Sequence, residues 1–178
     1  MVSLSFVFWM MVCLFSVIGA MRGWAKELLV SFSVILSLTF ITLLQNYVPY
    51  FRDILVNDPV SMFWARASIL LLLVFFGYQT PNIPKLADKF TRERLQDALL
   101  GIFLGAINGY LVAGSLWFFL TEANYPFAMI TDPLKSGIQQ YADSAKIILT
   151  YLPPALLGVP TIYFTVVLAF AFVIVVFI

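Results

Sequence analysis

The sequence predicts an all-α integral membrane protein, a bundle of five transmembrane helices made of a four-span core and a C-terminal span. Hydrophobic residues make up 62% of the chain and charged residues only 11%, whereas soluble domains carry about 25% charged residues. The apolar residues also form five continuous runs without strand-like alternation, which favours helices over a membrane β-barrel. We therefore expect one transmembrane domain over residues 1–178.

The lengths of the runs predict the individual spans, because a helix needs about 20 apolar residues to cross a bilayer, with a range of about 17 to 25. The runs cover residues 4–20, 28–44, 62–78, 98–120 and 159–178. We expect the first to be an uncleaved anchor, because Arg22 and Lys26 follow its apolar core, whereas the basic residues of a signal peptide precede it.

An amphipathic surface helix is expected before the last span. Asp132 and Pro133 form a helix-start signal, apolar residues then recur every three or four positions, and Pro153-Pro154 ends the pattern. We expect this helix to lie on the outer membrane face or to cap the bundle.

The distribution of Lys and Arg predicts the orientation in the membrane. The loops after the first and third runs together hold six basic residues, whereas the loops on the opposite side hold three. We therefore expect the N-terminus outside and the C-terminus in the cytoplasm.

Composition argues against an enzyme. The chain has no histidine and a single cysteine, Cys13, and its carboxylates are scattered over the loops. No nucleophile, base and metal-ligand set is recognisable, so we expect no catalytic, cofactor-binding or metal-binding residues. The net charge of +1 also gives no reason to expect a nucleic-acid partner.

A glycine-rich face marks the fourth run, LLGIFLGAINGYLVAG. Gly101, Gly105 and Gly109 recur every four residues and so share one helix face. Small residues let helix backbones approach closely in lipid, so we expect a packing face of the glycine-zipper type. Its partner is another helix of the chain or a second copy. Asn108 is expected to join helices by hydrogen bonds, or alternatively to line a polar pathway.

Arg66 is the basic residue expected inside a span, near the outer end of the third run. It is expected to reach outward to headgroups. The alternative is an ion pair inside the bundle with a carboxylate of the outer side; the candidates are Asp53, Asp58, Glu122 and Asp132.

Two stretches resemble a known family. After the first span the chain has a G-x-x-R-G-x-x-x-E turn, which also reads as an ordinary cytoplasmic hairpin; its residues are Gly19, Arg22, Gly23 and Glu27. The fourth span follows the pattern D-R-x-x-G-x-x-x-G-x-x-R-G, with Ala98 and Asn108 at the two arginine positions. Over about residues 1–120 the chain resembles the colicin V production protein family of bacterial inner-membrane proteins.

The resemblance implies a multi-pass protein of the bacterial inner membrane that supports toxin biosynthesis and secretion or envelope homeostasis, and it implies no catalytic residues. Its expected partners are the lipid bilayer and further copies of the chain or other membrane proteins. The nearly charge-free last run motivates an alternative, an accessory subunit of a larger respiratory or photosynthetic complex. A channel or transporter is a weaker alternative, because the spans lack paired ionisable groups near the midplane.

Overall fold

The computed structural model describes residues 3–51, 53, 58–79, 94–130, 132–135 and 139–177, and these residues form helices and turns without a β-strand. The four long helices are α1 (Leu4–Arg22), α2 (Trp24–Tyr47), α4 (Pro59–Tyr78) and α6 (Arg94–Glu122). The C-terminal part holds the 3₁₀ helix η1 (Pro133–Lys135) and the helices α7 (Gln139–Thr150), α8 (Pro153–Leu156) and α9 (Thr161–Phe177).

Four of the five expected spans correspond to long apolar helices, and the fifth corresponds to a shorter one. In the described part of the chain, α1, α2, α4 and α6 are the four helices that are long and apolar enough to cross a membrane. Each extends beyond its apolar run, because polar residues at the ends continue the helix. The expected fifth span corresponds to α9, which has only 17 residues.

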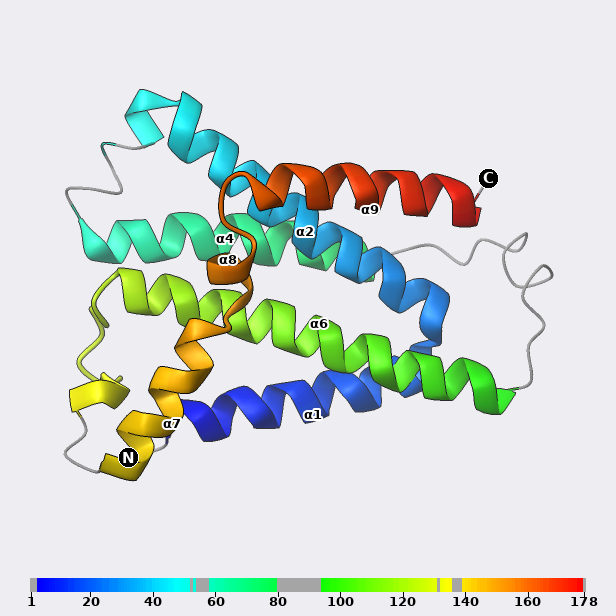
Figure 1. Cartoon of the computed structure of the whole chain (residues 1–178), viewed down its shortest axis with the longest axis horizontal. Helices are drawn as coiled ribbons and strands as arrows, with labels where there is room; N and C mark the ends of the chain where they lie inside the picture. The colour runs from blue at the N-terminus through cyan, green and yellow to red at the C-terminus, as the bar shows by residue number, and fades with distance from the viewer. Residues whose placement is uncertain are drawn as a thin grey trace.

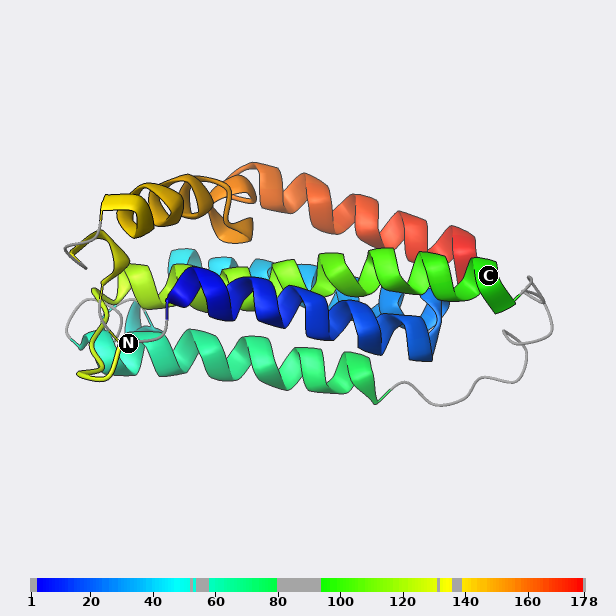
Figure 2. The same ribbon diagram turned by 90° about the horizontal axis from the view of Figure 1, so that it is seen from below.

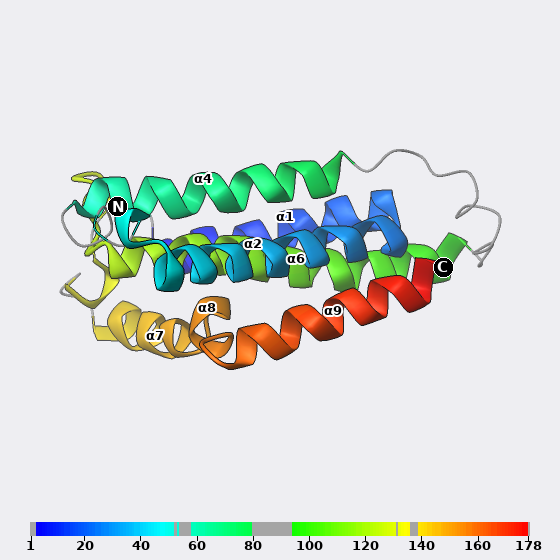
Figure 3. The same cartoon turned by 90° about the horizontal axis from the view of Figure 1, so that it is seen from above.

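The helices form three layers. α1, α2 and α6 make the middle layer, α4 covers one side of it, and α7 to α9 cover the other (Figures 2 and 3). The four long helices alternate in direction, and α9 begins partway along the bundle and ends at the same end of the bundle as the turn between α1 and α2 (Figure 1). The two chain ends therefore lie at opposite ends of the bundle.

Two groups of buried apolar side chains hold these layers together. The larger joins α2, α4, α6 and the start of α9, and includes Val34, Leu70, Leu111 and Ile162. The smaller joins α1, α6 and the α7–α8 region. Many large apolar side chains on the outside are exposed, among them Trp9, Phe76 and Phe164, as expected for helices that face lipid.

The amphipathic helix starts later than the sequence indicates. Asp132 does act as a cap, since its carboxylate accepts a hydrogen bond of 3.0 Å from the Leu134 N–H, but only the short η1 follows. Residues 136–138 lie outside the described residues. In α7, Ala145 is fully buried, and it packs in one cluster with Phe8 and Trp117. This helix therefore lies against the side of the bundle.

Most of the basic loop after the third run, at 80–93, lies outside the described residues. The orientation in the membrane therefore remains a prediction.

Candidate functional site

The three predicted packing glycines lie against α1 of the same chain. A Cβ on Gly101 would overlap the Gly19 carbonyl oxygen, and one on Gly105 would overlap that of Phe15. At Gly109 an added Cβ would come within 2.8 Å of the Val12 Cα. Because the α1 backbone fills this groove, a second copy of the chain cannot use the same face.

This close approach brings the α1–α2 turn onto the first turns of α6. Gly23 joins the two helices with φ 84°, a left-handed conformation that glycine adopts without strain. The Asp97 carboxylate lies against Gly23 and accepts a hydrogen bond of 3.1 Å from the Trp24 N–H. Asp97 thus satisfies one of the free N–H groups at the start of α2.

Glu27, one turn further along α2, is completely buried. Its Oε1 pairs with Arg22 Nη1 at 2.8 Å. The Asn108 amide of α6 donates to Glu27 Oε2 at 2.8 Å and to the Glu27 backbone oxygen at 2.9 Å. A single carboxylate therefore joins the end of α1, the start of α2 and the middle of α6.

Two further residues complete what we call the Glu27 cluster, which consists of Arg22, Glu27, Ser31, Tyr78 and Asn108. The Ser31 hydroxyl donates to Asn108 Oδ1 at 2.7 Å. Arg22 Nη2 donates to the Tyr78 backbone oxygen at 3.0 Å, and the guanidinium lies 4.3 Å from the centre of the Tyr78 ring. Through Tyr78 the cluster also holds the end of α4.

The Glu27 cluster is electrically balanced. An unpaired carboxylate in a low-dielectric interior costs several kcal/mol, and a paired and hydrogen-bonded one costs far less. Arg22 supplies the opposite charge, and Asn108 supplies neutral donors. This geometry agrees with the reading of Asn108 as a residue that joins helices.

A second polar group, the Arg66 cluster of Gln45, Arg66 and Glu122, lies in the other half of the bundle. Arg66 is only 7% exposed, and its Nη1 pairs with the Glu122 carboxylate. In the favourable orientation of the Gln45 amide, its oxygen accepts from Arg66 Nε at 2.6 Å and Nη2 at 2.7 Å. The expectation that Arg66 reaches outward to headgroups is therefore wrong; Glu122 was one of its four candidate partners.

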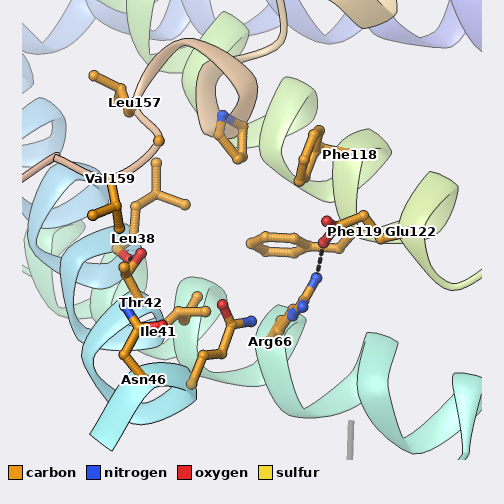
Figure 4. Close-up of a pocket in the computed structure, with 13 residues that line it drawn as sticks. Leu38, Ile41, Thr42, Asn46, Arg66, Phe118, Phe119, Glu122, Leu157 and Val159 are labelled. Carbon is orange, nitrogen blue, oxygen red and sulfur yellow. Dashed lines mark hydrogen bonds and ion pairs between the residues drawn. The ribbon is translucent and has the colours of Figure 1, made fainter. Parts of the chain in front are cut away.

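A cavity of about 220 Å³ lies beside the Arg66 cluster. Figure 4 shows Arg66 and Glu122 on one side of it, and Thr42, Asn46 and Val159 on the other. Its walls come from α2, α4, α6 and the link between α8 and α9; the remaining lining residues are Leu38, Ile41, Gln45, Phe118, Phe119, Pro154, Leu157 and Gly158.

Sequence reasoning missed this cavity and the roles of Gln45 and Asp97. Gln45 carried no signal beyond its place at the end of an apolar run. Asp97 belonged to the quoted family pattern. Its position just before the packing glycines could have indicated that it contacts the helix packed against them. No group of three potential metal-ligating His, Cys, Asp or Glu side chains occurs among the residues described.

Long apolar helices around buried, charge-balanced polar clusters define a polytopic helical membrane protein. The sequence model of the family described as Colicin V production protein matches residues 4–144. The chain therefore belongs to the colicin V production protein family, and the match extends beyond residue 120, where the resemblance in the sequence was expected to end. Comparisons with curated proteins and with solved structures found no match.

Proposed function

We propose that this chain is a non-enzymatic protein of the bacterial inner membrane that supports the production and secretion of a peptide toxin. Family membership over residues 4–144 is the observation that carries the proposal, and that membership supports a role in toxin production. The N-terminus lies outside and the C-terminus in the cytoplasm, as the distribution of basic loop residues predicts.

The Glu27 cluster supports an architectural role. The buried carboxylate contacts Arg22 and Asn108, and these contacts tie α1, α2 and α6 together. A group held in this way is suited to fixing helix positions. We therefore propose that the four long helices act as a rigid unit that presents its lipid-facing surfaces to other membrane proteins or to further copies of the chain.

The apolar C-terminal helix has a partner within the chain. Phe32 of α2 and Phe170 of α9 stack edge to face with ring centres 4.7 Å apart. Packing onto α2 thus partly explains the apolar last run, the feature that motivated the alternative of an accessory subunit of a larger complex.

The proposal is tested in a toxin-secreting bacterial host from which the gene for this chain is deleted. We expect the amount of toxin in the medium to fall and to recover with the wild-type gene. Glu27→Gln should restore secretion poorly, whereas Asp143→Asn, which removes an exposed carboxylate of α7, should restore it fully. Unchanged secretion in the deletion strain would rule out a role in toxin production.

The same strains distinguish envelope maintenance from secretion. If the chain maintains the envelope, the deletion strain should become sensitive to detergents even when no toxin is made. If it acts only in secretion, sensitivity should appear only in cells that make toxin. Measuring growth in detergent with and without toxin expression separates the two roles.

A further inference from the structure

The cavity beside the Arg66 cluster has the polarity of a binding site for a small ligand. It is lined by one basic and one acidic side chain and by the polar residues Thr42, Gln45 and Asn46, while its other walls are apolar. With a single carboxylate among its lining residues, it is poorly suited to a metal ion, which takes several oxygen or nitrogen ligands. Its 220 Å³ corresponds to the liquid volume of about seven water molecules, which is room for an organic group.

The acidic side of the cavity has free capacity for a donor. The Glu122 side chain is 40% exposed, whereas that of Arg66 is 9% exposed. Across the cavity from Glu122 (Figure 4), the Thr42 hydroxyl donates to the Leu38 carbonyl oxygen at 2.8 Å, so its own oxygen is left as an acceptor. An ammonium group, with its positive charge and three N–H donors, matches the exposed Glu122 carboxylate.

The basic side retains some capacity as well. A guanidinium has five N–H donors, and the contacts to Glu122 and Gln45 use three of them. A phosphate oxygen in the plane of the Arg66 guanidinium can accept hydrogen bonds from the remaining N–H groups. The site thus presents a positive and a negative group next to each other, which is the complement of a zwitterion.

The position of the cavity favours a lipid as the source of that zwitterion. Gln45 lies near the end of α2 and Glu122 is the last residue of α6, so the site lies toward one end of the bundle, where headgroups are expected. Val159, which lines the cavity, is 58% exposed, so the site opens to the outside. On the adjoining helix α9, Phe164 and Leu168 are 75% and 73% exposed, and they share a face along which acyl chains can lie.

We propose that this cavity binds the headgroup of an amine-bearing zwitterionic phospholipid of the phosphatidylethanolamine type, with its ammonium on Glu122 and its phosphate on Arg66. A choline headgroup lacks N–H donors, and a glycerol headgroup lacks the positive charge. The site should therefore discriminate among these three lipids.

The test measures lipids retained by the full-length protein in mild detergent. Delipidated protein is incubated with equal amounts of phosphatidylethanolamine, phosphatidylcholine and phosphatidylglycerol, and bound lipids are counted by native mass spectrometry. We expect phosphatidylethanolamine to be retained about tenfold more than the other two, the preference that one charge-assisted hydrogen bond provides. Equal retention of the three lipids would overturn the proposal.

Variants locate the binding. Glu122→Gln should reduce phosphatidylethanolamine to the level of phosphatidylcholine, whereas Asp143→Asn, which removes the same charge away from the cavity, should leave the preference intact. Val159→Trp fills the mouth of the cavity without touching the ion pair and should remove the preference. If Glu122→Gln fails to fold, Val159→Trp alone tests whether the lipid binds in this cavity. An unchanged preference for phosphatidylethanolamine in Val159→Trp would refute the proposal.

Free phosphoethanolamine distinguishes a lipid site from a site for a soluble zwitterion. Because the acyl chains contribute to binding, it should displace the lipid only at a far higher concentration than phosphatidylethanolamine does. Displacement at the same concentration would overturn the assignment to a lipid.

Discussion

Glu27 on α2 and Asn108 on α6 are joined by two hydrogen bonds, of 2.8 Å to the carboxylate and 2.9 Å to the backbone oxygen. Both side chains are fully buried. The contact places a charged residue in the interior of a membrane bundle, where Arg22 balances it at 2.8 Å. From these contacts we predict how substitutions that change charge or shape alter the stability of the helix bundle.

Replacing Glu27 by Gln should destabilise the fold strongly. The change leaves the Arg22 guanidinium without its counter-charge, and breaking a buried pair in this way costs about 3 kcal/mol. Thermal unfolding of the purified protein in detergent measures the loss. The double variant Arg22→Gln/Glu27→Gln should recover part of it, and strictly additive losses would show that the two charges do not interact.

Replacing Asn108 by Asp should also destabilise the protein, although the two side chains have nearly the same shape. The new carboxylate would face Glu27 Oε2, and repulsion between two carboxylates would replace the hydrogen bond that the amide donates. Asn108→Asp should therefore unfold at a lower temperature than the wild type when both are heated in detergent at neutral pH. An unchanged unfolding temperature would contradict the geometry described here.

Replacing Gly105 by Ala should separate α1 from α6. The added methyl would overlap the Phe15 carbonyl oxygen, and overpacking of this kind costs about 1 to 3 kcal/mol. Gly158→Ala is the matched control, because the nearest atom to a Cβ there is 3.9 Å away. We expect a lower unfolding temperature without a change of oligomeric state. A change in detergent-extracted size with normal stability would instead point to contact between copies.

Removing the charge of Glu122 and removing the charge of Arg66 should destabilise the protein by unequal amounts. Glu122→Gln leaves a buried guanidinium without its counter-charge, whereas Arg66→Gln leaves a carboxylate that is 40% exposed. Since the uncompensated buried charge is the costly one, Glu122→Gln should lower the unfolding temperature more than Arg66→Gln. The reverse order would indicate that Glu122, not Arg66, is the desolvated partner.

The start of α4 should lose its cap in acid. Hydrogen bonds from the Ser61 hydroxyl and the Val60 N–H lower the pKa of the exposed Asp58 below its ordinary value. A lowered pKa in the folded state stabilises the fold above the unfolded pKa, and this contribution is lost as the pH falls through the folded pKa. The protection of the amides at the first turn of α4, measured as the exchange rate relative to the intrinsic rate at each pH, should therefore fall at low pH in the wild type. Asp58→Ala should remove that dependence.

How much of the fold was predictable is seen most clearly in the helices. The run at 98–120 predicted α6, and the actual helix extends to Arg94–Glu122, because hydropathy marks only the part that faces lipid or core. The last apolar run, at 159–178, said less about whether its helix crosses the membrane. A chain of 17 helical residues is near the lower limit for crossing a bilayer, so composition alone did not decide whether α9 spans.

The sequence indicated several residues of the candidate site, but it did not indicate which of them contact each other. Asn108 was singled out by residue type, because an amide is unusual in an apolar helix and therefore signals a specific contact. Arg22, Gly23 and Glu27 were singled out through the resemblance to the family. Arg66 had four possible carboxylate partners on the basis of sequence. Choosing Glu122 required knowledge of which helix lies beside α4.

The sequence by itself determined that this chain is a helical membrane protein, since hydropathy and helical period are local properties that depend only on neighbouring residues. Only the tertiary structure decided that Gly105 faces α1 of the same chain and that Arg66 pairs with Glu122 next to a cavity. These relationships join residues far apart in the chain. They depend on which helix faces pack together, and that is set by the shapes and charges of all the helices at once.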